Sequence, residues 1–116
     1  MSKIPLSKAR RAAGLVFLAG ELPFAKDGSI PSGIEAQAQT VLDSIAATLK
    51  GEGLALDDVV SVLVHLFDKK DFAPFNEVYK RYFKEPWPAR TTVRVDLLPE
   101  GALLEVTVVA AARSQA

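Results

Sequence analysis

Two charged side chains fall within predicted strands of largely apolar sequence, and these residues are the best suited to carry chemistry. Arg90 lies near the start of the segment 89–97, and Glu105 lies inside 103–112, the most apolar segment of the chain. A guanidinium is the natural bidentate partner of a carboxylate, and a carboxylate in a partly dry pocket can orient and deprotonate water. Together, the two residues predict a site for a small carboxylic acid that is hydrolysed beside its carboxyl group.

The same residues also have a purely structural interpretation. If residues 98–101 form a hairpin turn, Glu105 lies roughly opposite Arg94, and the two side chains can form a cross-strand ion pair. Arg90 can equally be an ordinary surface charge near the end of a strand. The residues alone leave both interpretations open.

The rest of the composition excludes several kinds of chemistry. Cysteine is absent and His65 is the single histidine, so thiolate nucleophiles, thiolate metal sites and paired imidazole ligands are not available. We therefore expect no metal ion. Fourteen basic residues balance fourteen acidic ones, which argues against nucleic-acid binding. No apolar run is long enough to cross a membrane, and no cleavage site typical of a signal peptide follows the N-terminal apolar run, so we expect a cytoplasmic protein.

Hydrophobic periodicity predicts the elements that must position these residues. Apolar runs predict strands over residues 15–19, 59–67, 89–97 and 103–112, with room for a further strand before residue 15. Apolar residues at helical spacing predict one helix that begins after Ser32, with Glu35 completing a capping box, and that ends at Gly51. A second helix is predicted over 68–83, with Asp71 as its cap.

This order of elements predicts a single α/β (α+β) domain over residues 1–116. Strand–helix alternation followed by two strands is typical of a mixed β-sheet with two helices packed on one face. The other face of the sheet would carry Val59, Leu63 and Phe67, which need a second apolar surface. We therefore expect a closed homo-oligomer that covers this face.

Several segments resemble one known family. The sequence from Pro88 to Val93, with the triplet around Glu105 that follows it, is similar to the C-terminal signature of the Rid/YjgF reactive intermediate deaminases. Residues 18–23, 35–38 and 72–79 resemble other segments of the same family, so the similarity covers nearly the whole chain. The resemblance implies a chorismate-mutase-like fold and a homotrimer, in which the sheets form a central barrel and the sites lie in clefts between subunits.

The resemblance also implies roles for individual residues. Arg90 matches the arginine that binds the substrate carboxylate, and Glu105 matches the glutamate that positions water for attack on the imine carbon. Asn76 matches an asparagine near the pocket, and Gly20 matches a glycine whose backbone lines it. Thr92 stands where many members have a cysteine whose main chain contacts the ligand.

One position departs from the pattern of the family. Leu6 stands where the best-known deaminases carry a tyrosine, and it offers no hydroxyl to the imine or its water. The expected function is hydrolysis of 2-imino or enamine acids to 2-oxo acids and ammonia, without a cofactor. The alternative is a non-catalytic trimer that binds small carboxylate metabolites such as 2-oxo acids.

Overall fold

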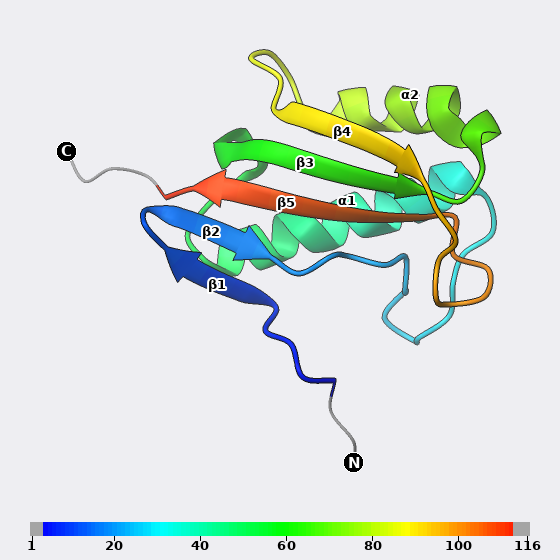
Figure 1. Cartoon of the computed structure of the whole chain (residues 1–116), viewed down its shortest axis with the longest axis horizontal. Coiled ribbons are helices and arrows are strands. Elements are labelled where there is room, and N and C mark those ends of the chain that lie inside the picture. The colour runs from blue at the N-terminus through cyan, green and yellow to red at the C-terminus, as the bar shows by residue number, and fades with distance from the viewer. Residues whose placement is uncertain (1–3, 113–116) are drawn as a thin grey trace.

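The computed structural model describes residues 4–112, which form a five-stranded mixed sheet and two helices (Figure 1). The strands are β1 (Ala9–Ala12), β2 (Leu15–Leu18), β3 (Val59–Leu66), β4 (Ala89–Arg94) and β5 (Leu104–Ala111). Their order across the sheet is β1-β2-β5-β3-β4, so β4 lies at one edge and β5 at the centre. The further strand for which the sequence left room is therefore present as β1.

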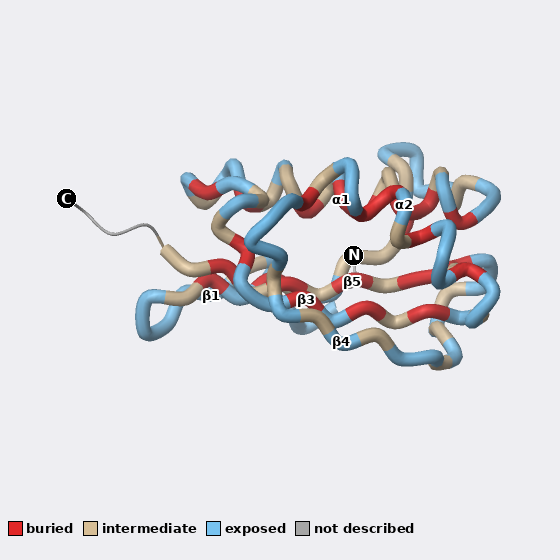
Figure 2. Tube along the Cα trace, turned by 90° about the horizontal axis from the view of Figure 1, so that it is seen from above, coloured by how far each residue is buried: buried red, intermediate tan, exposed pale blue. Residues whose placement is uncertain are grey.

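Both helices, α1 (Ile34–Gly51) and α2 (Phe72–Tyr82), pack on the same face of the sheet (Figure 2). The apolar stripe of α1 is buried against alternate residues of the strands, such as Val64 and Val106, which are fully buried. Short 3₁₀ turns precede β3 (Leu56–Asp58) and α2 (Lys69–Asp71). The mixed sheet with two helices on one face, predicted from the sequence, is confirmed.

The expected hairpin between the last two strands is wrong. β4 pairs with β3 in parallel, and β5 pairs with the other side of β3 in the antiparallel direction. The chain passes through α2 between β3 and β4. Two strands joined by such a crossover helix run parallel to each other in the sheet. Residues 95–103 then carry the chain across the end of β3 instead of folding back onto β4.

The start of α1 differs from the predicted cap, and α2 starts later than predicted. Gly33 is the N-cap of α1, with φ 88° and no side-chain cap bond, so the predicted Ser32–Glu35 capping box does not form. Glu35 pairs instead with Arg81 of α2, at 3.3 Å between Oε2 and Nη1. A 3₁₀ turn occupies residues 69–71, so α2 begins at residue 72 and not at 68. Asp71 is its N-cap residue, as predicted, although its side chain makes no cap bond.

Gln37 fixes α1 to the segment that leads into β5. Its side chain is buried and makes three hydrogen bonds to the main chain. The amide Nε2 donates to the carbonyls of Pro31 and Gly101, at 2.9 Å each, and Oε1 accepts from the N–H of Leu103 at 2.8 Å. Because the Gln37 side chain is itself buried and all three bonds go to the main chain, Gln37 sets the position at which β5 begins.

The sheet face away from the helices is the one that the sequence left uncovered. Leu63 and Phe67 lie on it and are 36% and 47% exposed, as expected. The prediction that Val59 lies on this face is wrong, because a β-bulge between Val59 and Ser61 turns the Val59 side chain into the core under the helices. Phe17 of β2 and Val93 of β4 add to the same exposed apolar surface, which we call the open face. Within residues 4–112, neither helix is long and apolar enough to span a membrane.

Candidate functional site

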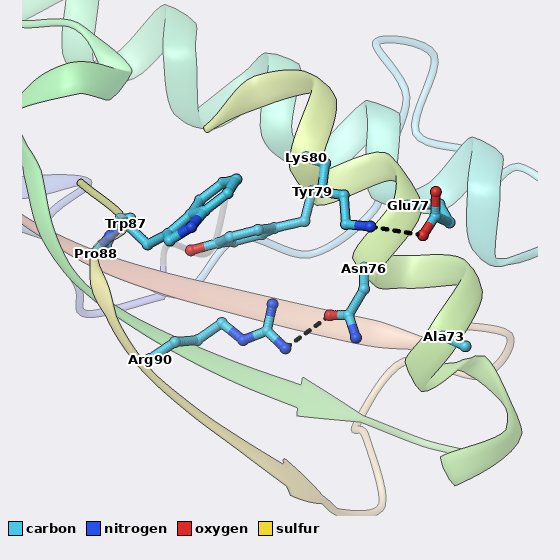
Figure 3. Close-up of a pocket in the computed structure, with 8 residues that line it drawn as sticks. All are labelled: Ala73, Asn76, Glu77, Tyr79, Lys80, Trp87, Pro88 and Arg90. Carbon is cyan, nitrogen blue, oxygen red and sulfur yellow. Dashed lines mark hydrogen bonds and ion pairs between the residues drawn. The ribbon is translucent and has the colours of Figure 1, made fainter. Parts of the chain in front are cut away.

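Arg90 points to the helix side of the sheet, where α2 receives it. Arg90 is paired with Val62 of β3, and Val62 is buried beneath the helices, so both side chains lie on that face. The Arg90 Nη2 donates a 2.7 Å hydrogen bond to Oδ1 of Asn76. The guanidinium carbon lies 4.8 Å from the centre of the Tyr79 ring, within the range of a cation–π interaction (Figure 3).

A cavity of about 490 Å³ opens beside this guanidinium (Figure 3). It is lined by residues of α2 and by the chain that leads into β4, namely Ala73, Asn76, Glu77, Tyr79, Lys80, Trp87, Pro88 and Arg90. Among residues 4–112, no carboxylate lies within ion-pair distance of Arg90. The guanidinium is therefore held by an amide and an aromatic ring, and it keeps donors for an anion in the cavity.

Burial and the positive charge of Arg90 shift the pKa of the Tyr79 hydroxyl in opposite directions. Burial raises the pKa of Tyr79 above its ordinary value, and the positive charge of Arg90 opposes this rise without cancelling it. Tyr79 is therefore a neutral phenol at neutral pH. Its ring supports Arg90 without competing with a bound anion for the positive charge.

Glu105 lies in the central strand and points to the open face. It is paired with His65 of β3, on the side opposite to the buried residues Val64 and Leu66. The carboxylate rests against Gly20, where a Cβ would overlap Glu105 Oε2 and would lie 3.1 Å from Thr107 Oγ1. In the part of the chain that the structure describes, Glu105 has no ion-pair partner within 4.0 Å.

The main chain brings Gly20 beside Glu105. The next residue, Glu21, exchanges two hydrogen bonds with Val106, at 2.8 Å from its N–H and 3.1 Å to its carbonyl. This bridge continues the pairing of β2 with β5 past the end of the strand. A side chain at position 20 would fill the space that the carboxylate occupies.

Replacing Gly20 by alanine should displace the Glu105 carboxylate and leave the fold intact. The backbone of Gly20 is not left-handed, and the atom that a Cβ would meet is the end of a flexible side chain. We expect the free energy of unfolding to change by less than about 1 kcal/mol, and any activity that depends on Glu105 to fall by about tenfold or more. Urea unfolding and steady-state kinetics measure the two effects.

Gly51→Ala is the matched control, because a Cβ at Gly51 meets nothing within 4 Å and the backbone there is helical. Its activity should equal that of the unmodified chain. If Gly20→Ala keeps full activity, the contact between Gly20 and Glu105 has no functional role.

Arg90 and Glu105 lie on opposite faces of one sheet. Arg90 shares a face with Val62, whereas Glu105 shares a face with His65, and these two positions of β3 differ by an odd number of residues. The two side chains therefore cannot reach the same small ligand within one chain. The possible ion pair between Glu105 and Arg94 does not form either, because β3 lies between their strands.

Thr92 and Leu6, the other positions singled out, do not line the cavity beside Arg90. Thr92 is paired with Val64 on the helix side, and its hydroxyl is buried without a hydrogen-bond partner. Leu6 is exposed and lines a shallow groove with Phe17 and Ala19. It is thus nearer to Gly20 than to the cavity.

Two aromatic residues that the sequence analysis did not place in the site line the cavity. Tyr79 is at the same time a buried core residue, whereas Trp87 is 49% exposed. The available signal was their spacing from polar site residues. Tyr79 lies one helical turn after Asn76, and Trp87 immediately precedes the segment Pro88–Arg90.

Known metal-binding patterns are absent from the described residues. Within residues 4–112, no group of three or more histidine, aspartate or glutamate side chains is arranged to hold a metal ion. The polar groups that could contact a ligand are the guanidinium and amide of the Arg90 cavity, and the carboxylate and hydroxyl beside Gly20.

Comparison with known proteins gives consistent results. The sequence profile of the family described as Endoribonuclease L-PSP matches residues 1–112. A RutC family protein of Pyrococcus horikoshii is 44% identical over 108 residues, which cover 91% of this chain and 86% of the relative. A RidA crystal structure from an Antarctic Psychrobacter gives a TM-score of 0.88 at 34% identity, over 96% of this chain and 91% of that one.

A third relative carries an enzymatic name and a bound ligand. TdcF of Escherichia coli, provisionally named a reactive intermediate deaminase, is 35% identical over 100 residues, or 83% of this chain and 78% of TdcF. Its crystal structure with bound serine gives a TM-score of 0.88 at 32% identity, over 97% of this chain and 91% of that one. The profile match and these similarities show that the chain belongs to the Rid/YjgF family, the family that the Endoribonuclease L-PSP profile describes.

Proposed function

We propose that the protein is a deaminase that hydrolyses 2-imino and enamine acids to 2-oxo acids and ammonia. The observation that carries this proposal is the Arg90 guanidinium, which faces a cavity, is held by Asn76 and Tyr79, and has no carboxylate partner within residues 4–112. A guanidinium that faces a cavity and has no carboxylate partner is suited to bind a small carboxylate ligand. The reactive intermediate deaminase name of TdcF supports the same reaction class.

In the proposed reaction, Arg90 binds the substrate carboxylate and Glu105 activates water. Two guanidinium N–H groups hold the carboxylate and fix the adjacent imine carbon in position. Glu105 takes one proton from a water molecule as its oxygen adds to the protonated imine carbon, which gives a carbinolamine. Glu105 passes this proton to the nitrogen, and the C–N bond breaks as the carbinolamine hydroxyl gives its own proton to Glu105. The departing ammonia takes that proton, so the products are ammonium and the 2-oxo acid. The protonated imine is itself a strong electrophile, so the step needs no cofactor.

Because Arg90 and Glu105 lie on opposite faces, this mechanism needs two copies of the chain. One copy would supply the Arg90 side of the site, and its neighbour would supply Glu105 and Gly20. The open face gives a physical reason for association, since exposed apolar side chains such as Leu63 and Phe67 would be covered. We propose a closed homotrimer with one such site at each interface.

The alternative function is binding of small carboxylates without turnover. Leu6 favours it, because a leucine at this position supplies no hydroxyl to an imine or its water. Serine bound to TdcF shows that a small molecule with a carboxylate binds to a relative. A binding role would use Arg90 in the same way but would not require Glu105.

Cleavage of RNA, which the family description suggests, is the weaker assignment for this chain. Its fourteen basic and fourteen acidic residues leave no surplus of positive charge. Binding to RNA draws much of its affinity from neutralised phosphates. The cytoplasmic location and the extent of the domain over residues 1–116 stay predictions.

A turnover assay separates the deaminase from the binder. An amino-acid oxidase, with catalase present, generates the imine in solution, and semicarbazide traps whatever imine escapes hydrolysis. The deaminase should lower the initial rate of trapping in proportion to the amount of protein added, whereas heat-inactivated protein should not. If trapping is unchanged while 2-oxo acids raise the Tm of the protein, it is a binder and the deaminase proposal is refuted.

A further inference from the structure

The cavity beside Arg90 continues past the guanidinium into an aromatic and apolar region. Trp87 and Tyr79 form its walls, with Pro88 and Ala73 adjoining them. In Figure 3 the rings of Trp87 and Tyr79 lie on the same side of the Arg90 side chain. We call this region, made of Ala73, Tyr79, Trp87 and Pro88, the aromatic subsite.

The charged residues near the aromatic subsite do not offer a second polar anchor. Glu77 and Lys80 lie at the rim and pair with each other at 3.0 Å. Both are well exposed, so they stay hydrated when the cavity is filled. A ligand that enters next to Arg90 therefore meets one strong anion-binding group and an apolar wall.

The volume of the cavity, as one chain forms it, leaves room for a ligand larger than one that carries only a carboxylate and a methyl group. About 490 Å³ lies within the range of sites that enclose larger organic ligands. A small acid bound to Arg90 would leave the Trp87 ring in contact with water. A ligand that carries a ring on the carbon next to its reacting centre would cover the Trp87 ring.

From this arrangement we infer that the aromatic subsite binds the substrate side chain, and that the substrates are 2-imino acids bearing an aromatic ring. This inference rests on the proposed function. The flat and half-exposed ring of Trp87 suits the stacked or edge-to-face contacts of another ring. The Tyr79 ring already packs against Phe83 and Arg90, so it adds apolar surface to the subsite and not a second stacking face. A cationic side chain is disfavoured, because Arg90 already occupies the Tyr79 ring and adds its own positive charge.

Binding of stable 2-oxo acids tests the inference without turnover. Isothermal titration calorimetry compares phenylpyruvate with pyruvate, which share the carboxylate and differ by the ring. Burial of the ring should make phenylpyruvate bind about 10-fold to 100-fold more tightly. Trp87→Ala should weaken phenylpyruvate by about tenfold and change pyruvate by less than about twofold. Trp87→Phe should recover most of the loss.

The same titrations separate this inference from the function on which it rests. If both acids bind equally, or if Trp87→Ala weakens both to the same extent, the aromatic subsite is refuted. Arg90→Gln should weaken both acids, because they share the carboxylate. If neither acid depends on Arg90, the carboxylate-binding role fails, and the proposed function fails with it.

Discussion

Arg90→Ala is expected to abolish clearance of an oxidase-generated imine, with a fall in kcat/KM of about 100-fold to 10,000-fold. Each charge-assisted hydrogen bond between a guanidinium and a carboxylate contributes about 1.5–3 kcal/mol, and a bidentate contact makes two of them. Loss of Arg90 also releases the imine carbon from its position relative to water. The oxidase-coupled trapping assay described above measures the effect.

Two further variants make this result specific. Arg90→Lys keeps the charge but not the planar fork, so it should recover only a small part of the activity. Arg81→Ala is the matched control, because Arg81 is an exposed arginine on α2 that pairs with Glu35 outside the cavity. Its kcat/KM should stay within about twofold of the unmodified chain. Unchanged clearance by Arg90→Ala would remove Arg90 from the mechanism.

The sequence predicts the secondary structure well because the signal for each element is local. Apolar residues at helical spacing identify α1, and β-branched apolar runs identify β3 and β5. Which strands become neighbours is not a local property. Residues 95–103 resemble a hairpin connection between β4 and β5. Because α2 connects β3 to β4, however, β4 runs parallel to one side of β3, and β5 pairs with the other side of β3.

The candidate site shows the same division between local and long-range information. The chemistry of Arg90 and Glu105 could be predicted from residue type, and the resemblance added Gly20 and Asn76. That Arg90 and Glu105 lie on opposite faces depends on strand register, which the expected hairpin had wrong. The aromatic subsite could not be predicted from the sequence, because it forms between α2 and the chain that leads into β4. Only the arrangement of these two segments in space shows that Trp87 is half exposed and lines a cavity.

The division of the site between two copies has a consequence that a mixing experiment can measure. Arg90→Ala lacks the carboxylate-binding group and Glu105→Gln lacks the base, so each variant alone should have less than about 1% of the activity. A mixed assembly contains interfaces where an intact Arg90 from one chain meets an intact Glu105 from its neighbour. With equal amounts and random assembly in a closed ring, about one quarter of all interfaces have this composition.

The most direct test of a site shared between copies is therefore the activity of the two variants after they are unfolded and refolded together. Each variant and the unmodified chain are refolded separately in the same way, which corrects for recovery. If the site is shared between copies, the mixture should regain about one quarter of the activity of the refolded unmodified chain. A mixture that stays as inactive as its two components would contradict a site shared between copies, and so would a Glu105→Gln variant that is fully active by itself.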